Sequence, residues 1–390
     1  RRRAASTSGG RVKSIDMTAS VVGSRPPVKP VTACWAYAAP VRGVVARRHR
    51  LVVEDLPDPT PEAGEALVAL EACGICGSDL HTLAHAEVLT EVAAAMGVDV
   101  GFDSNADYYL GHEWVGEILD LGAGTADAAV SPGDRVVSMP YLVRGPDLVP
   151  LGFSNDHYGG YCEQFLLTAA LCLPVPNGLD VRRAALTEPM AVGLHAVNKA
   201  NLQAGDTALV VGCGPIGLAL IAWLRTRGVE PIVACDYSAQ RRALAARLGA
   251  HVVVDPREQP GIDAWRTAAP GRPLVIFEAV GVPGILDDVI ATAPPHARVV
   301  VAGVCMQPDH IRPLLAVVKE LNLQFVYAYD GDEFAATLRA LAEGTPDVAP
   351  MITGRVGFDG VAGTFDLLGA ADHHVKVLVE PDGPSEPGPL

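Results

Sequence analysis

Residues 72–81, ACGICGSDLH, bring two cysteines, an aspartate and a histidine into one short stretch. A C-x-x-C pair can be half of a structural zinc knuckle, a thiol–disulfide pair, or a site where one thiolate binds a metal. A knuckle needs a second Cys or His pair at similar spacing, but no second C-x-x-C occurs in the sequence. A thioredoxin-type pair needs an adjoining βαβ unit, whereas this stretch lies among short β-rich runs. The pattern therefore favours a metal site that uses one thiolate.

Two further segments carry residue types that bind metals. LGHEWVGEI contains His112 and Glu113 directly before a predicted strand, and TEPMAVGLHA contains Glu188 at the start of a predicted helix. One thiolate, one imidazole and one or two carboxylates from separate segments describe a catalytic zinc site with an open coordination position. A histidine beside a glutamate is common on protein surfaces, so the prediction depends on the combination.

A second constellation predicts a nucleotide site. VVGCGPIG follows a predicted strand at 207–211 and opens a helix, the context in which G-x-G-x-x-G binds a pyrophosphate. The first glycine makes the tight turn, the second lets the backbone approach the phosphates, and the third allows close helix–strand packing. The helix N-terminus supplies N–H donors to the anion. The motif residues predicted to bind the cofactor are Gly212, Gly214, Pro215, Ile216 and Gly217.

Asp236, at the end of the next predicted strand, indicates which nucleotide is bound. Its carboxylate can accept hydrogen bonds from the adenosine ribose hydroxyls and would repel a 2′-phosphate. The following residue is Tyr237 rather than arginine, which favours NAD over NADP. Arg241 lies either near the ribose or at a surface position of the following helix.

Composition limits the class of protein. A chain of 390 residues is long enough for two domains with their own cores. Its net charge of −15 argues against a nucleic-acid surface. No stretch of about twenty apolar residues is present, so no membrane span is expected. The cysteines lack a framework spacing, which indicates reduced thiols in the cytoplasm.

Two kinds of pattern divide the chain. Residues 31–189 contain β-rich runs such as GEALVALEACG, WVGEILDLGAG and GDRVVSMP, which predict a mostly antiparallel β domain. In residues 190–329, six apolar strands alternate with helical segments, which is typical of a doubly wound parallel sheet. Residues 330–380 are too few for a third domain and should return to the first. Residues 1–30 and 381–390 are expected to be disordered tails, although the basic first tail could instead dock on an acidic surface.

At this point the sequence resembles a known family. The motifs CGICGSDLH, GHEWVGE, GDRVV, GGYCEQFLL, TEPMAVGLHA, VVGCGPIG with Asp236, and KVLVEP occur in the order found in the zinc-dependent medium-chain alcohol and polyol dehydrogenases. The resemblance covers about residues 40–380. It implies an α/β protein with a GroES-like folded β catalytic domain and a Rossmann domain. It also implies hydride transfer between NAD and a secondary, polyol or cyclic alcohol.

The resemblance assigns roles to individual residues. Cys76 would be the zinc thiolate and His112 the imidazole ligand, while Cys73 would be a core residue. Glu113 would lie in or beside the metal shell, and Glu188 would occupy the third-ligand position, as in the polyol, butanediol and threonine dehydrogenase branch. The remaining roles concern protons: Asp79 would accept the other ring N–H of His112, and Ser78 and His81 would carry the substrate proton to solvent. Alternatively, Ser78 is a turn residue and His81 a surface residue.

Two departures from the family pattern matter. Relatives often hold a second zinc with four closely spaced cysteines after the GDRV strand, but the corresponding stretch here contains only Cys162. One catalytic zinc and no structural zinc are therefore expected. The separation of Cys76 and His112 is longer than in the family, so the insertion at 82–110 should enlarge or line the substrate cleft. The aromatic residues Tyr108, Tyr109 and Trp114 either face an apolar or cyclic alcohol or pack internally.

Two rival functions stay open from the sequence alone. One is a zinc-free quinone or enoyl reductase of the same fold, which would lack the thiolate and the G-H-E motif. The other is a non-catalytic NAD-binding protein whose insertion fills the cleft. Because relatives form dimers or tetramers, a homodimer or homotetramer is expected, with a small-molecule alcohol or ketone as substrate.

Overall fold

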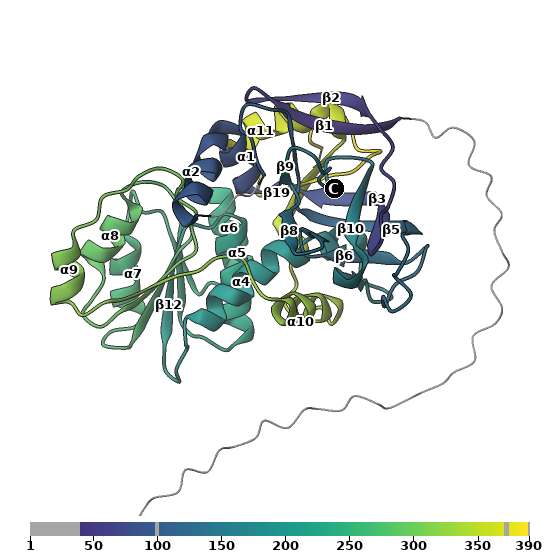
Figure 1. Ribbon diagram of the computed structural model, residues 1–390. Coiled ribbons are helices and arrows are strands. Elements are labelled where there is room, and N and C mark those ends of the chain that lie inside the picture. Colours follow the sequence, from purple (N-terminus) through teal and green to yellow (C-terminus); the bar gives the residue numbers. More distant parts are fainter. Residues whose placement is uncertain (1–39, 98–100, 370–373, 389–390) are drawn as a thin grey trace, which may run out of the picture. The chain divides into compact units, whose positions relative to one another are not determined.

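The computed structural model describes residues 40–97, 101–369 and 374–388 (Figure 1). The predicted tail at 1–30 lies outside these residues. Six parallel strands form one sheet in the order β14-β13-β12-β15-β16-β17. These strands are β12 (Thr207–Val211), β13 (Ile232–Cys235), β14 (Val252–Val254), β15 (Leu274–Glu278), β16 (Arg298–Val301) and β17 (Asn322–Phe325). All six predicted strands are confirmed. Their order is that of dinucleotide-binding sheets, in which the ligand binds where the order reverses, here between β12 and β15.

Helices cover both faces of this sheet (Figure 1). One face packs on α5 (Pro215–Thr226) and α6 (Ala239–Leu248), and the other on α7 (Gly261–Ala268) and α8 (Ile285–Thr292). Side chains alternate along a strand, so Ala208 and Val210 of β12 join the first core and Leu209 joins the second. Burial on both faces explains why these strands are apolar throughout.

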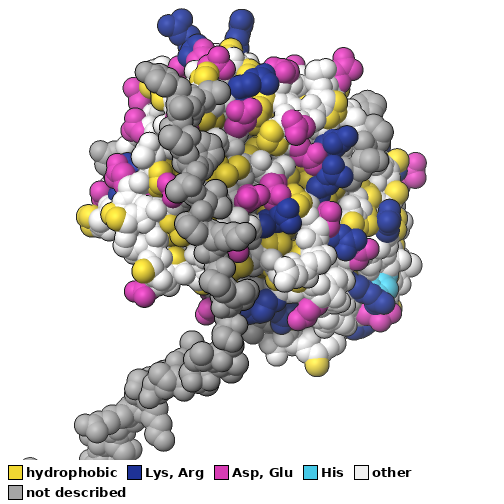
Figure 2. All heavy atoms as spheres, turned by 90° about the vertical axis from the view of Figure 1, so that its right-hand side faces the viewer, with side chains coloured by type: hydrophobic (Ala, Val, Ile, Leu, Met, Phe, Trp, Pro, Cys, Tyr) yellow, Lys and Arg dark blue, Asp and Glu magenta, His cyan; other side chains and the backbone are white. Residues whose placement is uncertain are grey.

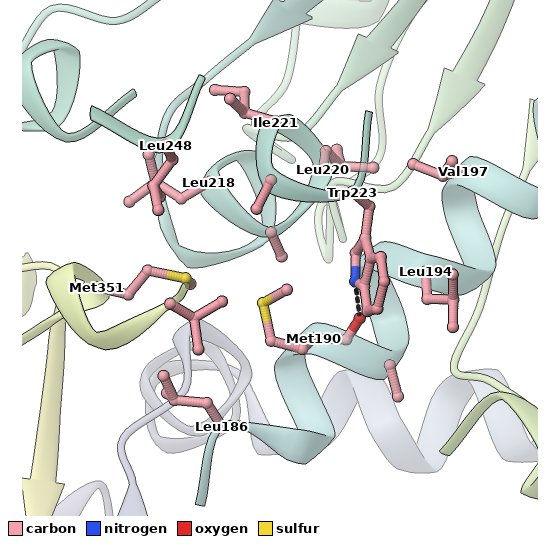
Figure 3. Close-up of a cluster of buried hydrophobic side chains, with 14 of the residues drawn as sticks. Leu186, Met190, Leu194, Val197, Leu218, Leu220, Ile221, Trp223, Leu248 and Met351 are labelled. Atoms are coloured by element: carbon pink, nitrogen blue, oxygen red, sulfur yellow. Dashed lines mark hydrogen bonds between the residues drawn. The ribbon is translucent and has the colours of Figure 1, made fainter. Parts of the chain in front are cut away.

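Helix α4 (Thr187–Lys199) carries Glu188 in its first turn and packs closely on α5. This packing fixes the position of Glu188. The indole Nε1 of Trp223 donates a hydrogen bond of 2.8 Å to the carbonyl oxygen of Met190 (Figure 3). A Cβ at position 193 would lie 2.7 Å from the Cβ of Ala219, so glycine is needed for this helix approach. Leu186, directly before α4, lies in the same apolar cluster.

The β-rich part contains a seven-stranded sheet in the order β11-β6-β5-β3-β19-β18, with β10 also on β3, a four-stranded sheet β2-β1-β4-β9, and the hairpin β7-β8. β3, β5 and β6 are strands that the sequence predicts. The bounds are β1 (Val41–Arg47), β2 (Arg50–Leu56), β3 (Glu65–Gly74), β4 (Tyr108–Leu110), β5 (Glu113–Leu121), β6 (Arg135–Ser138), β7 (Tyr141–Arg144), β8 (Asp147–Pro150), β9 (Phe153–Ser154), β10 (Gln164–Thr168), β11 (Cys172–Pro174), β18 (Ile352–Val356) and β19 (Lys376–Val379).

The remaining helices connect these sheets. Within the insertion, residues Ala86–Met96 form helix α2 and residues 108–110 form the short strand β4. Helix α10 (Gly331–Ala342) contacts α4, because its Glu333 accepts from His195 Nδ1 at 2.7 Å. The helices are α1 (Gly77–Ala84), α2 (Ala86–Met96), α3 (Val181–Ala185), α9 (Pro313–Val318), α10 (Gly331–Ala342) and α11 (Val361–Gly369), with 3₁₀ turns at Ala169–Leu171, Ala349–Met351 and Phe358–Gly360.

The last part of the chain returns to the seven-stranded sheet of the β-rich part, as the sequence predicts. Val379 of β19 pairs with Cys73 of β3 in an antiparallel arrangement. Residues 381–388 differ from the disorder expected for 381–390, because Gly388 and Arg355 exchange backbone hydrogen bonds of 3.1 Å. These bonds satisfy backbone groups on the free edge of β18. Residues 389–390 lie outside the described part.

The face drawn in Figure 2 carries acidic and basic side chains interspersed, without a continuous basic region among its described residues. None of the helices in the described ranges is long and apolar enough to cross a membrane.

Candidate metal and nucleotide sites

Pairing between β3 and β5 brings the two metal-binding motifs together. Gly74 at the end of β3 is opposite Glu113 at the start of β5, so Cys76 and His112 emerge at the same edge of the sheet. One ligand atom each from Cys76, His112 and Glu113 lies within 4.8 Å of the other two. Thiolate, imidazole and carboxylate are the donors that zinc prefers. In the part of the chain that the structure describes, this is the one cluster of this kind.

Asp79 connects the cysteine segment with the histidine. Its side chain is fully buried, and Oδ2 accepts hydrogen bonds from the backbone N of Cys76 at 2.9 Å and from the hydroxyl of Tyr161 at 2.7 Å. Oδ1 accepts from the backbone N of Gly111 at 3.3 Å and lies 3.3 Å from His112 Nδ1. The distance between Asp79 Oδ1 and His112 Nδ1 is short enough for an ion pair, but the two groups are not aligned for a hydrogen bond.

The surroundings of His112 favour positive charge. Burial by itself lowers the pKa of His112, but the Asp79 carboxylate and the Cys76 sulfur raise it well above its usual value. Surroundings that stabilise an imidazolium also stabilise a bound cation. Because Nδ1 faces Asp79, the other ring nitrogen, Nε2, is the one available to a metal.

Lys376, which the sequence analysis did not single out, pairs with Glu113. Its Nζ lies 2.6 Å from Oε2 and 2.7 Å from Oε1 of Glu113, and it donates to the carbonyl oxygen of Ile75 at 2.9 Å. Both side chains are fully buried. A Cβ at Gly74 would overlap the Glu113 carboxylate, so glycine is required at that position. A lone lysine at the start of the apolar run KVLVEP was the available sequence signal.

Glu188 lies in the first turn of α4, outside the cluster of Cys76, His112 and Glu113. Burial is the main reason that the pKa of Glu188 is raised to about 7; the His112 and Lys376 charges oppose this rise, and the Glu113 charge adds to it. The hydroxyl of Tyr329 is buried without an aligned hydrogen-bond partner among the described residues, and its interaction with Glu188 stabilises the charged carboxylate. A carboxylate and a hydroxyl beside the metal-binding cluster can contact a polar ligand.

The remaining predicted residues of the first domain divide into two groups. Ser78 Oγ lies 3.4 Å from His112 Nε2, next to the cluster, and His81 is half-buried on α1. Burial, and secondarily His85, lowers the pKa of His81. Cys73 is fully buried in the core, where burial raises the pKa of its thiol, in agreement with a core role.

The aromatic residues near the insertion pack against other rings of the protein, which was one of the two possibilities that the sequence left open. Tyr108 and Trp114 are only 1% and 2% exposed. The Tyr108 ring contacts Phe102 edge-on, and Trp114 packs against Phe165. Tyr109 makes an edge contact with Tyr158. Phe153 of β9 packs against His112, with a distance of 5.0 Å between the ring centroids.

The glycine motif has the geometry that a phosphate-binding turn requires. Gly212 has φ +91°, and a Cβ at Gly217 would overlap the carbonyl oxygen of Gly212. A Cβ at Gly214 would meet no atom within 4 Å, so the backbone there faces open space. Pro215 begins α5 and Ile216 follows it, which places the free N–H groups of the helix N-terminus at the turn.

Asp236 supports this turn from the next strand. Its Oδ2 accepts from the backbone N of Cys213, and its Oδ1 accepts from the backbone N of Ser238, both at 2.8 Å. An ionised carboxylate has about four acceptor sites, so further hydrogen bonds remain possible. Arg241 lies in the first turn of α6, with a buried Nε that has no hydrogen-bond partner within the described ranges.

Comparison with known proteins agrees with this arrangement. The model of the alcohol dehydrogenase GroES-like domain matches residues 62–177, and that of the zinc-binding dehydrogenases matches residues 215–343. The (R,R)-butanediol dehydrogenase of Bacillus subtilis is 31% identical over 341 residues, covering 85% of this chain and 96% of the relative. The sorbitol dehydrogenase of Gallus gallus is 27% identical over 361 residues, covering 89% and 97%. The crystal structure of 2R,3R-butanediol dehydrogenase from Bacillus subtilis has a TM-score of 0.73 at 28% identity, covering 88% of this chain and all of that one.

The chain belongs to the zinc-dependent medium-chain alcohol and polyol dehydrogenases, with a GroES-like domain and a Rossmann-type parallel sheet. It is accordingly an oxidoreductase that acts on CH–OH groups with zinc and a nicotinamide cofactor. The zinc-free reductase and the non-catalytic protein are not favoured.

The buried pair of Glu113 and Lys376 predicts a large stability effect. Lys376→Met should lower the free energy of unfolding of the metal-free protein by about 3–5 kcal/mol, because it leaves a buried carboxylate uncompensated. Replacing both residues, as Glu113→Leu with Lys376→Met, should recover most of that loss. Urea unfolding measures both variants. If Lys376→Met were as stable as the wild type, the charges of Glu113 and Lys376 would not be buried together.

Proposed function

We propose that this enzyme oxidises a secondary carbinol of a diol, polyol or cyclic alcohol with NAD, and reduces the corresponding ketone with NADH. The observation that carries the proposal is the convergence of the half-buried Cys76 with the buried His112 and Glu113 in one cluster. The butanediol and sorbitol dehydrogenases among the relatives support a substrate with neighbouring hydroxyl groups. The buried hydroxyl of Tyr329, beside Glu188, would contact the second hydroxyl.

The residues fit a single zinc ion. Cys76 and His112 would be ligands, with Glu188 as the third ligand and Glu113 in the shell or beside it. Zinc when bound acts as a Lewis acid that makes a coordinated hydroxyl more acidic and polarises a carbonyl. No structural zinc is proposed, since Cys162, the one cysteine of the corresponding stretch, is fully buried beside Val45 and Leu56.

The proton from the substrate needs a route out of the site. Ser78 Oγ lies next to His112 and would accept the hydroxyl proton and pass it toward His81. Burial lowers the pKa of His81, which favours the neutral imidazole, the form that can accept a proton. Asp79 keeps His112 oriented through the contact with Nδ1.

The cofactor would bind where the strand order reverses, with its pyrophosphate on the turn of Gly212, Gly214 and Gly217. Asp236 would bind the ribose hydroxyls, which supports NAD, and Arg241 would lie beside it.

The NAD-binding domain would span residues 190–329, and the catalytic domain would consist of residues 31–189 and 330–380. We also propose a cytoplasmic location, which the absence of disulfides among the described cysteines supports.

A homodimer or homotetramer is supported by an apolar face on the parallel sheet. Helix α9 has no buried residue, its Leu314, Val317 and Val318 are about two-thirds exposed, and Phe325 of β17 is also exposed. β17 is an edge strand of the described sheet, and such an edge can pair with its symmetry copy. Leu314→Asp combined with Val318→Asp should convert the oligomer to monomers in light scattering. An unchanged mass would exclude this face as the interface.

Cys76→Ala tests the metal assignment. It should remove tight zinc binding and lower kcat/KM at least about a thousandfold, because Lewis-acid stabilisation is worth several kcal/mol. NADH affinity, measured by fluorescence titration, should not change. The matched control is Cys73→Ala in the same motif, which should retain zinc. Full zinc content and turnover in Cys76→Ala would refute the assignment.

Asp236 determines cofactor choice in this proposal. Asp236→Ala should narrow the ratio of kcat/KM for NAD over NADP by about tenfold, the equivalent of about 1.4 kcal/mol of lost repulsion and hydrogen bonding. Asp236→Asn, which keeps one acceptor oxygen for the turn, separates the loss of charge from the loss of loop support. A ratio unchanged in both variants would count against the ribose role.

A further inference from the structure

Tyr161 lies behind the metal-binding cluster, in the segment between β9 and β10, and has no assigned role. Its side chain is fully buried, and its hydroxyl donates the shortest of the hydrogen bonds to Asp79, at 2.7 Å. The accepting atom, Oδ2, also accepts from the backbone N of Cys76. Tyr161 therefore acts on the carboxyl group that contacts both the thiolate segment and His112.

Four groups surround the two oxygen atoms of Asp79. The backbone N–H of Cys76 and the Tyr161 hydroxyl lie at Oδ2, and the backbone N–H of Gly111 and His112 Nδ1 lie at Oδ1. A carboxylate has about four acceptor sites, of which three accept these hydrogen bonds and the fourth faces His112 Nδ1. The hydroxyl of Tyr161 is the one side-chain donor at Oδ2, and its loss would leave that oxygen with the longer bond from the backbone N–H of Cys76 alone.

The tyrosine ring is held from several sides. A Cβ at Gly111, which has φ +91°, would lie 2.7 Å from Cδ1 of Tyr161, so the ring packs directly on the backbone before His112. The backbone N of Val44 donates to the carbonyl oxygen of Tyr161 at 2.9 Å, and the ring of Phe365 makes an edge contact with a centroid distance of 6.3 Å. A ring fixed in this way gives its hydroxyl one position.

We propose that Tyr161 is a positioning residue of the metal site, whose hydroxyl holds the Asp79 carboxylate in the orientation that keeps Cys76 and His112 at metal-binding distance. This inference rests on the proposed function, since it requires zinc at the cluster. Tyr161 would act on the metal ligands indirectly, through its hydrogen bond to Asp79. Removing outer partners of metal ligands weakens metal binding by about 10–100-fold in other proteins.

The test compares Tyr161→Phe with Tyr108→Phe in the purified full chain. Tyr108 is equally buried in the same core, but its hydroxyl lies 3.4 Å from the backbone oxygen of Thr82, away from the metal-binding cluster. Zinc affinity is measured by chelator competition, and the ligand-field absorption spectrum is recorded after cobalt substitution. Tyr161→Phe should bind zinc about tenfold more weakly and shift the cobalt spectrum, whereas Tyr108→Phe should change neither.

A double-mutant cycle shows whether Tyr161 acts through Asp79. The zinc-affinity losses of Tyr161→Phe and Asp79→Asn should be less than additive in the combined variant, because both remove the same contact. Wild-type affinity and an unchanged cobalt spectrum in Tyr161→Phe, or full additivity in the cycle, would overturn the inference. If instead the wild type binds no zinc, or Cys76→Ala retains it, the proposed function itself fails.

Discussion

The buried carboxylate of Asp79 is the group on which the geometry of this site depends. A carboxylate removed from water costs several kcal/mol unless hydrogen bonds and nearby positive groups compensate it. Here the compensation comes from the segments of Cys76, Gly111 and Tyr161, and from His112. Folding therefore cannot bury Asp79 without bringing the cysteine and the histidine together. The register of β3 and β5 sets their approximate positions, and Asp79 sets the final ones.

The carboxyl groups of Asp79, Glu113 and Glu188 lie near the imidazole of His112. Neighbouring groups compensate the negative charge of each carboxyl group to a different extent. Asp79 accepts three hydrogen bonds, and Glu113 is neutralised by Lys376. Glu188 has the weakest compensation, and its pKa is raised to about 7. Glu188 is consequently the carboxyl group of this set that has no ion pair with a neighbouring side chain among the described residues, and it can still interact with an added positive charge. A site in which one carboxyl group changes protonation near neutral pH is suited to binding a cation and to exchanging protons.

The features that the sequence predicted are those encoded locally. Apolar strands, the turn at Gly212 and the C-x-x-C segment each depend on residues close together in the chain, and the structure contains all of them. Lys376 and Tyr161 were missed because their partners are set by long-range contacts, of which the pairing of β19 with β3 is the clearest. No local pattern indicates that a lysine at 376 faces a glutamate at 113. The order in residues 381–388 likewise depends on β18, a distant strand.

The central claim is that one thiolate, from Cys76 and not Cys73, joins an imidazole and carboxylate oxygens around one zinc ion. X-ray absorption fine structure at the zinc edge tests it most directly in the purified full-length enzyme. The account predicts one zinc per chain with a single sulfur neighbour, the other neighbours being nitrogen or oxygen. Two or more sulfur neighbours, or full activity in a preparation without zinc, would contradict it.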